Sequence, residues 1–454
     1  MTNSGAARAD AVALAREPLV LDDLLENGQG VGRAGGFVTF VTGGLPGERV
    51  RIAVDEIKRK YASAHALEIE QASPDRVDPR CDVFPQCGGC QTRHLRYAAE
   101  LEWKRRLVTD ALVRLGGLRD IRVSEVWRAR RAENAGYRNK VTLVCSVRSG
   151  QARLGFYSAR SHRLVPIATC PVLVERLDEA VKGLVAFAGA APEALRGVDH
   201  IVARASTTGS DLVMSFNGRE PNRTLAASLG ELRRHVGSVS GVVTSWDPSS
   251  ENAVFGRRAA TLWGSGIVRE RVGAAAFSFG VASFFQINTP VLEEIGARVV
   301  TMLEGAGRVV DLYCGVGTFG VLLGKQGIAS TGVESFAPAV DEARANAAEN
   351  GVTSAQFECA AASAALAGER GRTLLAGASA VIVDPPRKGC EDGVIDGIAR
   401  SRVARVIYIS CNPATLARDA KLLLAAGYRM GAVAPFDMFP RTGHVELLAE
   451  FTRQ

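Results

Sequence analysis

One cysteine stands where a thiol could do chemistry. Cys411 follows an apolar segment, residues 405–409, that predicts a buried strand, and Asn412-Pro413 cannot continue that strand. Thr415 is predicted to cap the helix that comes next. Ligands of open α/β sheets bind outside the carboxyl ends of the strands. A thiolate at this place could therefore act as a nucleophile, although a half-buried structural cysteine would show the same pattern.

Acidic residues at the ends of other predicted strands indicate a methyl-donor site. Asp311 precedes a turn that contains Gly315, and such a turn lets a ligand approach the backbone. Glu334 ends the next strand, where an acid can bind both hydroxyls of a ribose. The turn alone is weak evidence for any ligand. The turn, Glu334 and Asp384-Pro385-Pro386 together predict binding of S-adenosylmethionine, with Asp311 at its amino-acid end.

The sequence after the fourth of these strands bears on the substrate. Enzymes that methylate amines carry Asn-Pro-Pro where this chain has Asp384-Pro385-Pro386. A nucleophilic cysteine points instead to a poorly nucleophilic carbon, such as C5 of a pyrimidine. Addition of the Cys411 thiolate at C6 would activate C5, and a base must then remove the C5 proton. Glu446 is the favoured base, and His444 is the alternative.

The chain has nine cysteines, and three of them are closely spaced. Cys81, Cys87 and Cys90 form a C-x5-C-x2-C pattern on a glycine-rich stretch, and Cys170 is available as a fourth ligand. Cys145 is the other possible ligand, but it lies in an apolar strand. The uneven spacing favours an iron–sulfur cluster over zinc, which usually takes two C-x2-C pairs. Inert thiols are the remaining interpretation.

These residues must be positioned by more than one domain. Residues 1–14 are expected to form a disordered leader, and the short strands and glycine turns of residues 15–72 predict a small OB-like β-barrel. Residues 73–285 are expected to form an α+β domain with the cluster cysteines, and its helix over 97–116 is expected to pack on the catalytic domain. In residues 286–454, helices alternate with buried strands, which predicts a Rossmann-like α/β domain.

The composition is that of an ordinary globular protein with a positive net charge. The chain has 454 residues, of which 47% are hydrophobic and 23% charged, and it shows neither a long apolar run nor a secretory signal. A cytoplasmic location without membrane attachment is therefore expected. The net charge is +7, which permits nucleic-acid binding. Basic residues gather in two clusters: Arg93, Arg96, Lys104, Arg105 and Arg106, and Arg128, Arg130, Arg131, Arg138 and Lys140.

With these motifs in view, the chain resembles the RNA uracil-5-methyltransferases, in particular the iron–sulfur type that methylates ribosomal or transfer RNA. The resemblance runs nearly from end to end. It rests on the four cysteines, Tyr137-Arg138-Asn139-Lys140, Ser283-Phe284-Phe285-Gln286-Ile287-Asn288, Asp311-Leu312-Tyr313-Cys314-Gly315, Asp384-Pro385-Pro386-Arg387-Lys388-Gly389, Ser410-Cys411-Asn412-Pro413 and His444-Val445-Glu446.

The resemblance implies a role for each matching residue. The barrel would be a TRAM domain, Cys411 the nucleophile and Glu446 the proton acceptor. The four cysteines would hold a [4Fe-4S] cluster. The chain would act as a monomer on RNA, ribosomal RNA rather than transfer RNA. The expected S-adenosylmethionine site comprises Gln286, Asp311, Tyr313, Gly315, Thr318, Glu334 and Asp384.

The resemblance is incomplete at two positions, and one other function is compatible with the motifs. Near the adenine the family often has an acid or amide after the third strand, where this chain offers only Glu358, slightly displaced. Thr318 stands where some members carry asparagine. The alternative function is an RNA-binding iron–sulfur module whose methyltransferase activity is vestigial or directed at a base other than uracil.

Overall fold

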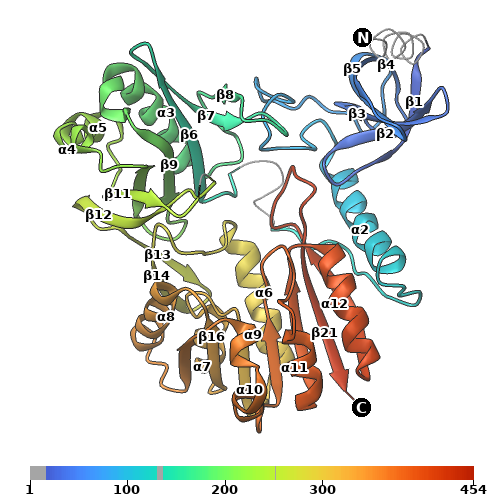
Figure 1. Ribbon diagram of the computed structural model, residues 1–454, viewed down its shortest axis with the longest axis vertical. Helices are drawn as coiled ribbons and strands as arrows, with labels where there is room; N and C mark the ends of the chain where they lie inside the picture. The colour runs from blue at the N-terminus through green and yellow to red at the C-terminus, as the bar shows by residue number, and fades with distance from the viewer. Residues whose placement is uncertain (1–16, 130–135, 251, 454) are drawn as a thin grey trace. The chain divides into compact units, whose positions relative to one another are not determined.

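The computed structural model describes residues 17–129, 136–250 and 252–453, which form two compact units. The first unit combines residues up to Lys104 with Tyr157–Val165 and Phe439–His444, and the second contains the rest of the chain (Figure 1). The leader expected at residues 1–14 lies outside the described residues, as do Arg130 and Arg131 of the second basic cluster.

The first unit begins with a closed five-stranded barrel, which confirms the predicted small β-barrel. Alternating apolar residues on its strands point inward, and the core they form includes Leu21, Val41, Val50 and Ile52. In barrel order the strands are β1 (Leu19–Leu24), β2 (Gln29–Ala34), β3 (Phe37–Thr42), β5 (Tyr61–Gln71) and β4 (Arg49–Ile57).

The cysteine-rich segment and the loop Phe439–His444 meet in the first unit. The carbonyl of Arg441 accepts hydrogen bonds from the backbone N–H groups of Gln91 and Thr92 at 2.9 and 3.1 Å. Glu100 is fully buried and pairs with both Arg441 and Lys104. Buried charges are found in folded proteins when they are paired in this way, so these contacts hold the loop in place.

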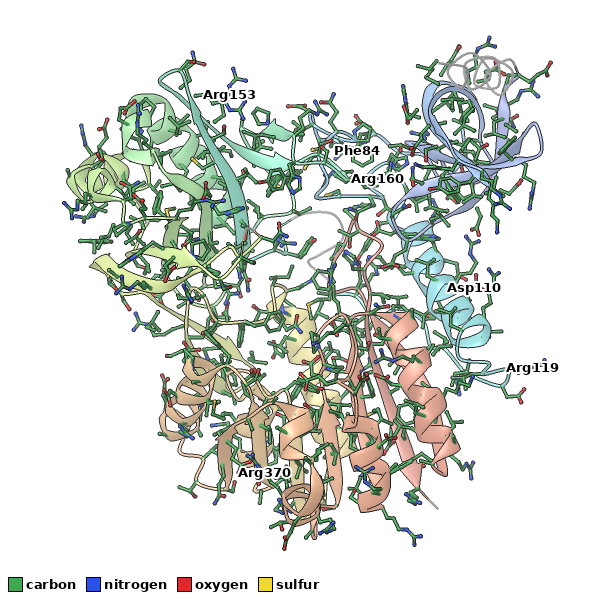
Figure 2. The ribbon with its side chains drawn as sticks, viewed as in Figure 1. Phe84, Asp110, Arg119, Arg153, Arg160 and Arg370 are labelled. Atoms are coloured by element: carbon green, nitrogen blue, oxygen red, sulfur yellow. The ribbon has the colours of Figure 1, made fainter. Side chains whose placement is uncertain are left out.

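Side chains of the first unit also connect its separate pieces of sequence. The guanidinium of Arg160 donates to Gln29 Oε1 of β2 at 3.1 Å, and the rings of Phe84 and His94 lie 5.0 Å apart (Figure 2). The unit is therefore assembled from segments that lie far apart along the chain.

Most of a seven-stranded sheet belongs to the second unit, and its strand pairs from β12 to β7 are antiparallel except that of β10 with β11. The helices α3 (Glu175–Ala190), α4 (Arg223–Ala227) and α5 (Leu229–His235) and the 3-10 turn η1 (Pro192–Leu195) belong to this part of the unit. In sheet order the strands are β12 (Gly256–Gly264), β11 (Gly241–Pro248), β10 (Leu212–Gly218), β9 (Val198–Ala205), β6 (Lys140–Arg148), β7 (Gln151–Tyr157) and β8 (Leu164–Pro166). The hairpin of β13 (Ile267–Val272) and β14 (Ala275–Gly280) follows.

A second seven-stranded sheet carries the predicted catalytic residues. Its first five strands are parallel, β21 runs antiparallel to them, and β20 runs antiparallel to β21 and so parallel to the first five. This is the arrangement of a class I methyltransferase, and it confirms the predicted α/β fold. In sheet order they are β17 (Ala355–Cys359), β16 (Ala329–Glu334), β15 (Arg308–Leu312), β18 (Ala380–Val383), β19 (Arg405–Ser410), β21 (Glu446–Arg453) and β20 (Tyr428–Phe436).

Helices cover this sheet and complete its core. The helices α7 and α8 contact β16 and β17, and α12 contacts β19 and β20 (Figure 1). The sheet reverses its order between β15 and β18, and ligands of such sheets bind at the carboxyl ends beside that point. The helices are α6 (Thr289–Met302), α7 (Thr318–Gly324), α8 (Ala337–Glu349), α9 (Ala362–Ala365), α10 (Gly368–Leu375), α11 (Val394–Ser401) and α12 (Pro413–Ala425).

The helix expected over residues 97–116 is α2 (Tyr97–Arg114). Val108 and Leu112, on its second half, are fully buried in the same apolar cluster as Leu416 and Leu423 of α12. That half of α2 is therefore part of the catalytic core. No helix among the described residues is long and apolar enough to cross a membrane.

Candidate active site

The strand register brings Cys411 and Glu446 together. In the antiparallel pair of β19 and β21, Ser410 lies opposite Leu447. Cys411 and Glu446 are the next residues along the two strands, and the charge of Glu446 acts on the Cys411 thiol. The Glu446 side chain is buried and Cys411 is partly buried. The predicted nucleophile and the predicted base are thus neighbours, although 35 positions separate them in the sequence (446 − 411).

The turn after Cys411 is fixed by Asn412, and the prediction of Thr415 as the helix cap was wrong. Asn412 is the N-cap of α12, and its Oδ1 accepts a hydrogen bond from the backbone N–H of Ala414 at 3.0 Å. Pro413 occupies the first helical position, where its fixed φ angle is favourable. The hydroxyl of Thr415 donates to the Asn412 carbonyl at 3.1 Å instead. The helix therefore begins immediately after the nucleophile.

The residues after Asp384 are held by side chains of α12. Asn412 Nδ2 donates to the carbonyl of Arg387 at 3.0 Å, and Arg418 donates to the carbonyls of Lys388 and Cys390. Gly389 has a φ of +81°, and a Cβ on it would lie 2.4 Å from Arg418 Nη2. The loop after Asp384 is thereby fixed relative to the residue that follows Cys411.

A buried carboxylate anchors this arrangement. Asp419 of α12 is 1% exposed, and its Oδ2 accepts from the hydroxyl of Tyr408 at 2.6 Å and from the backbone N–H of Cys390 at 3.1 Å. Its Oδ1 accepts from Arg418 Nε at 2.7 Å. Tyr408 lies on β19, three residues before Cys411. Asp419 therefore joins the nucleophile strand, its following helix and the loop after Asp384.

The acids of the predicted methyl-donor site lie at the carboxyl ends of adjacent strands. Asp311 on β15 is fully buried, and neither of its carboxylate oxygens has a partner among the described residues. Glu334 ends β16 and accepts from the backbone N–H of Gly315 at 3.2 Å. Asp384 follows β18, and its backbone N–H donates to the Leu312 carbonyl at 3.4 Å. The structure thus brings the three acids to one edge of the sheet.

The turn between β15 and α7 is shaped for a close ligand approach. Tyr313 has a φ of +68°, and its hydroxyl accepts from the backbone N–H of Glu391 at 3.3 Å. Thr318 is the first residue of α7, and Gly317 before it has a φ of +82°. Gly315, Gly317 and Gly320 together have the G-x-G-x-x-G spacing of dinucleotide sites. The glycine spacing therefore does not distinguish a methyl donor from a dinucleotide, and the acids must do so.

Two more residues bear on the predicted S-adenosylmethionine site. Gln286 comes before the turn between β15 and α7 in the sequence, and Glu358 comes after it. Gln286 precedes α6, and its carbonyl accepts from Asn139 Nδ2 at 3.4 Å. Glu358 lies on β17 and forms an exposed ion pair with Arg370 at 3.1 Å. A carboxylate engaged in this way gives no support for an adenine contact by Glu358.

Two protein-family models match parts of this chain. Residues 270–452 match the family tRNA (uracil-5-)-methyltransferase, and residues 19–67 match the TRAM domain. An uncharacterised RNA methyltransferase of Halalkalibacterium halodurans is 34% identical over 448 residues, which cover 95% of this chain and 95% of the relative. Another, of Thermosynechococcus vestitus, is 36% identical over 451 residues, which cover 96% of this chain and 97% of the relative.

The solved structure of the tRNA (uracil-54, C5)-methyltransferase of Pyrococcus abyssi, in complex with S-adenosyl-L-homocysteine, superposes with a TM-score of 0.73. It is 27% identical, and the match covers 96% of this chain and 100% of that one. The chain belongs to the RNA uracil-5-methyltransferase family. The protein is an S-adenosylmethionine-dependent RNA methyltransferase with an N-terminal TRAM domain.

The site of this RNA methyltransferase is dominated by buried acidic side chains. Burial raises the pKa of Asp384 to about 7, and it raises the pKa of Asp311, with Asp384 and Glu334 adding to the effect. Burial and then Asp384 raise the pKa of Glu446 well above its usual range, while Arg387 opposes the shift. An excess of acids without basic partners suits a cationic ligand, and S-adenosylmethionine carries a sulfonium and an ammonium group.

Cys411 shares this environment. Burial raises the pKa of its thiol to about 12, Glu446 and Asp384 contribute to the rise, and Arg387 acts in the opposite direction. Each of these acids therefore favours the thiol over the thiolate in the free enzyme. A cation bound beside them would shift the balance toward the thiolate.

The structure does not show the predicted iron–sulfur centre. The part of the chain that it describes contains no group of three or more His, Cys, Asp or Glu residues placed to hold a metal ion. Cys81, Cys87 and Cys90 lie in the first unit and Cys170 in the second. Cys145 is buried in β6, as its apolar surroundings predicted, and burial raises its pKa to about 12.

Sequence analysis missed Asp419, Tyr408 and Asn412 as parts of the site. A signal for the first two was present. Asp419 lies between the apolar residues Ala417 and Ala420 on the buried side of α12, and Tyr408 is the one hydroxyl within the apolar strand 405–409. A polar group in such a position needs a buried partner. The positions of Asp419 and Tyr408 in the sequence therefore predict that these two side chains form a buried pair.

Proposed function

We propose that this enzyme methylates C5 of a uridine in RNA, with Cys411 as the nucleophile and Glu446 as the base. The observation that carries the proposal is that Cys411 and Glu446 directly adjoin the paired residues Ser410 and Leu447, and that the charges of Glu446 and Asp384 act on the Cys411 thiol. A nucleophile alone would suit many reactions. A nucleophile paired with a buried carboxylate beside a site for a cationic methyl donor suits addition followed by proton removal.

The proposed reaction balances in three steps. The Cys411 thiolate forms a bond to C6 of the uracil, and the electron pair of the C5–C6 double bond moves toward the O4 carbonyl as an enolate. S-adenosylmethionine supplies the methyl group, which C5 takes, and S-adenosylhomocysteine is the leaving group. The Glu446 carboxylate then accepts the C5 proton, the C5–C6 double bond re-forms and the sulfur of Cys411 leaves C6 as the thiolate.

The residues around the pair have supporting roles in the proposal. Gln286, Tyr313, Gly315 and Thr318 would line the methyl-donor site together with Asp311, Glu334 and Asp384. The raised pKa values of Asp384 and Cys411 mean that the free enzyme holds protons that catalysis must release. A sulfonium beside these groups favours their ionised forms. Binding of the methyl donor would therefore prepare Cys411 for attack.

The identity of the RNA substrate is also part of this proposal. A target base must leave its stack to reach a thiol at a sheet edge, which favours a loop or a single strand. We propose ribosomal RNA as the substrate and a monomer as the active form. The similar enzyme of Pyrococcus abyssi is named for transfer RNA. Nucleoside mass spectrometry of both RNA fractions from a deletion strain will show which one loses 5-methyluridine.

Two substitutions test the chemistry. Cys411→Ala is expected to abolish 5-methyluridine formation while S-adenosylhomocysteine binding persists. Glu446→Gln is expected to trap RNA covalently on Cys411, because the C5 proton stays in place and the thiolate cannot leave. Glu304→Gln, which changes an exposed carboxylate before β15, is the matched control for Glu446→Gln and should retain activity. Full activity of Cys411→Ala would refute the proposal and favour the alternative of a vestigial catalytic domain.

The [4Fe-4S] cluster on Cys81, Cys87, Cys90 and Cys170 stays a prediction from cysteine spacing. One structural observation bears on it. Directly after Cys90, buried polar atoms of Gln91, Thr92 and Arg93 have no hydrogen-bond partner among the described residues. Buried polar atoms are usually paired, so a bound group in this region would account for them. The cluster has no step in the reaction proposed above.

A further inference from the structure

Lys140 is a largely buried cation for which the proposed reaction has no use. It is the first residue of β6, and among the residues that the structure describes it forms no ion pair. Its Nζ lies 5.7 Å from the centre of the Phe255 ring, which is a weak interaction at this distance. A buried charge normally has a partner of opposite sign. No acid of the described residues therefore serves as the partner of Lys140.

The nearest charged neighbours of Lys140 are also cations. Arg204 lies directly opposite it in the pairing of β6 and β9, and opposed residues of an antiparallel pair share one face. Arg204 is 1% exposed and donates to the carbonyls of Ser283 and Phe285. Arg138, two residues before Lys140, donates from Nε to the Lys140 carbonyl at 2.8 Å. Three cations thus gather at the start of β6.

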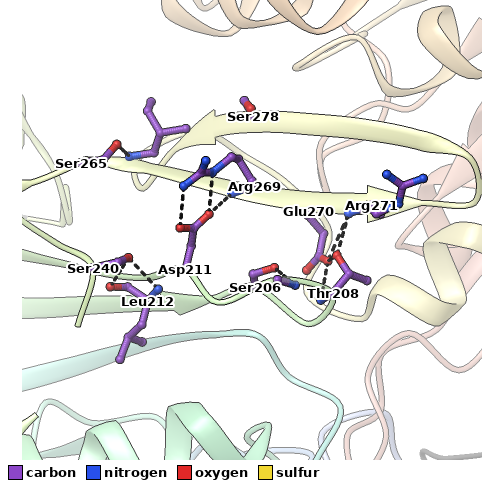
Figure 3. A network of polar contacts seen from close by, with 12 residues as sticks. Ser206, Thr208, Asp211, Leu212, Ser240, Ser265, Arg269, Glu270, Arg271 and Ser278 are labelled. Carbon is purple, nitrogen blue, oxygen red and sulfur yellow. Dashed lines mark hydrogen bonds and ion pairs between the residues drawn. The ribbon is translucent and has the colours of Figure 1, made fainter. Parts of the chain in front are cut away.

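The acids of this region make other contacts. Glu270 accepts from the backbone N–H groups of Thr207 and Thr208 at 2.8 and 3.0 Å, and Asp211 is paired with Arg269 at 3.0 Å (Figure 3). Glu342, the other acid that acts on Arg204, accepts from the backbone N–H of Gly280 at 2.8 Å with Oε1, while its buried Oε2 has no hydrogen-bond partner among the described residues. None of these acids forms an ion pair with Lys140.

This charge adjoins the segment that carries Gln286. Asn139, next to Lys140, donates from its backbone N–H to the Ile287 carbonyl at 3.0 Å and from Nδ2 to the Gln286 carbonyl at 3.4 Å. The guanidinium of Arg204 holds the same segment through Ser283 and Phe285. An anion that reaches Lys140 would therefore lie beside the methyl-donor loop, where the RNA has to enter.

We propose that Lys140, flanked by Arg138 and Arg204, binds a backbone phosphate of the RNA beside the target uridine. The inference rests on the proposed function for the identity of the anion. A phosphodiester supplies the missing negative charge and accepts several hydrogen bonds from an ammonium group. Because it contacts the backbone, Lys140 positions the strand and does not select its sequence.

The proposal gives RNA binding a particular dependence on pH. Burial, with Arg204 and Arg138 adding to its effect, lowers the pKa of Lys140 to about 7 in the free enzyme. A bound phosphate favours the charged amine and raises that pKa. Above pH 7 the enzyme must therefore take up a proton when RNA binds, and the affinity falls as the pH rises. An arginine at position 140 would keep its charge throughout this range.

Three variants test the site: Lys140→Met, Lys140→Arg and, as a matched control, Lys182→Met. Lys182 is an exposed lysine of α3 that pairs with Asp178, so its loss removes one surface charge while Asp178 still accepts from the backbone N–H of Cys170 at 2.7 Å. The probe is a short single-stranded RNA with one uridine, and its binding is measured by fluorescence anisotropy with S-adenosylhomocysteine present. Series in salt and in pH from 7 to 9 are recorded. Inorganic phosphate is added in a separate arm as a competitor.

Lys140→Met is expected to weaken RNA binding about tenfold at low salt. It should also reduce the slope of log affinity against log salt by about 0.7, the value for one phosphate contact on a single strand. Lys182→Met should change neither quantity. Lys140→Arg should keep the slope but lose the fall in affinity between pH 7 and 9. Inorganic phosphate should compete with RNA on the wild-type enzyme more strongly than on Lys140→Met.

An unchanged salt slope in Lys140→Met would overturn the proposal, and so would an unchanged pH dependence in Lys140→Arg. Should the methionine variant fail to fold, the arginine variant still decides through its pH series. The two proposals fail separately. RNA binding that depends on Lys140 without formation of 5-methyluridine would leave the phosphate site standing and refute the proposed reaction. Normal methylation with unaltered binding in the variants would do the reverse.

Discussion

Replacing Asp384 by asparagine should stabilise this enzyme while it damages catalysis. Asp384 follows β18 at the carboxyl edge of the catalytic sheet, and burial raises its pKa from 3.8 to about 7. A carboxyl group in such a place is more stable when neutral. The folded protein must therefore hold at neutral pH a charge that the unfolded chain carries at no cost. Asparagine has nearly the same shape and no charge, so it removes this disadvantage.

The size of the effect follows from the shift. The neutral form of Asp384 stabilises the fold fully below pH 3.8, and this contribution is lost as the pH rises through about 7. Each unit of pKa shift corresponds to about 1.4 kcal/mol. The advantage of Asp384→Asn should thus grow from about 2 kcal/mol at pH 5 to about 4 kcal/mol at pH 8. Glu446 lies close enough to act on the same charge, so these values are upper bounds for Asp384 alone.

Urea unfolding at pH 5, 6, 7 and 8 measures the difference between the variant and the wild-type enzyme. Methylation by the variant should fall at least tenfold, because Asp384 belongs to the proposed methyl-donor site. A difference in the free energy of unfolding that is constant or shrinks as the pH rises would refute the reasoning. Only a free-energy cost of ionising Asp384 in the folded state makes this difference grow with pH. Repeating the series with saturating S-adenosylmethionine should reduce the difference, because the bound cation compensates the charge of the wild-type carboxylate.

Three further predictions concern other parts of the molecule. Asp419→Ala leaves the Tyr408 hydroxyl and the Cys390 N–H without their acceptor, so it should lower the free energy of unfolding by about 3 kcal/mol in a urea titration. The control Asp341→Ala, on the surface of α8, should lower it by under about 0.5 kcal/mol. Gly389→Ala places a Cβ 2.4 Å from Arg418 Nη2 at a position with positive φ, so the loop after Asp384 must shift. In steady-state assays kcat should therefore fall by more than the RNA affinity changes. Anaerobic purification should give a brown protein with about four irons per chain by metal analysis, and Cys87→Ser should lower that number; a colourless protein would contradict the cluster.

The parts of the site that follow directly on single strands could be predicted from the sequence. Asp311, Glu334 and Asp384 each follow or end a buried apolar segment, and the parallel order of such segments places their ends at one edge. The position of Cys411 after a strand was predicted for the same reason and is confirmed by β19. These inferences need only the local pattern of apolar residues and the rule that parallel strands are joined by crossover helices.

Features that depend on pairing between distant segments could not be predicted. The register that opposes Cys411 to Glu446 is set by β21, which follows a long excursion through α12 and β20. A shift of one residue would have placed Glu446 on the other face. The neighbourhood of Lys140 and Arg204 depends in the same way on the pairing of β6 with β9. Sequence patterns give the period of a strand but not its partner or its register.

Domain composition was equally hard to anticipate. Residues 439–444 belong to the first compact unit although the chain on both sides belongs to the second. The reason is a buried ion pair between Glu100 and Arg441, two residues whose positions differ by 341. Nothing in the local sequence of Arg441 distinguishes a buried arginine from an exposed one. The helix cap was missed on a smaller scale, because both Asn412 and Thr415 suit that position and only the hydrogen bond to Ala414 decides between them.

The buried charges of the second unit have opposite signs at two places, and each place matches a ligand of the proposed reaction. Among the described residues, Asp311 and Asp384 form no ion pair and Glu446 is influenced by the charge of Arg387, and a methyl donor is a cation. Lys140 forms no ion pair among the described residues, Arg204 is influenced by Glu342 and Glu270, and RNA is an anion. The free enzyme thus buries ionisable groups at an energetic cost at both places, and each ligand removes part of that cost. Binding of either ligand should therefore stabilise the fold by more than its contacts alone provide. The same charges that make the unliganded site costly are those that make it selective for a cationic donor and a polyanionic substrate.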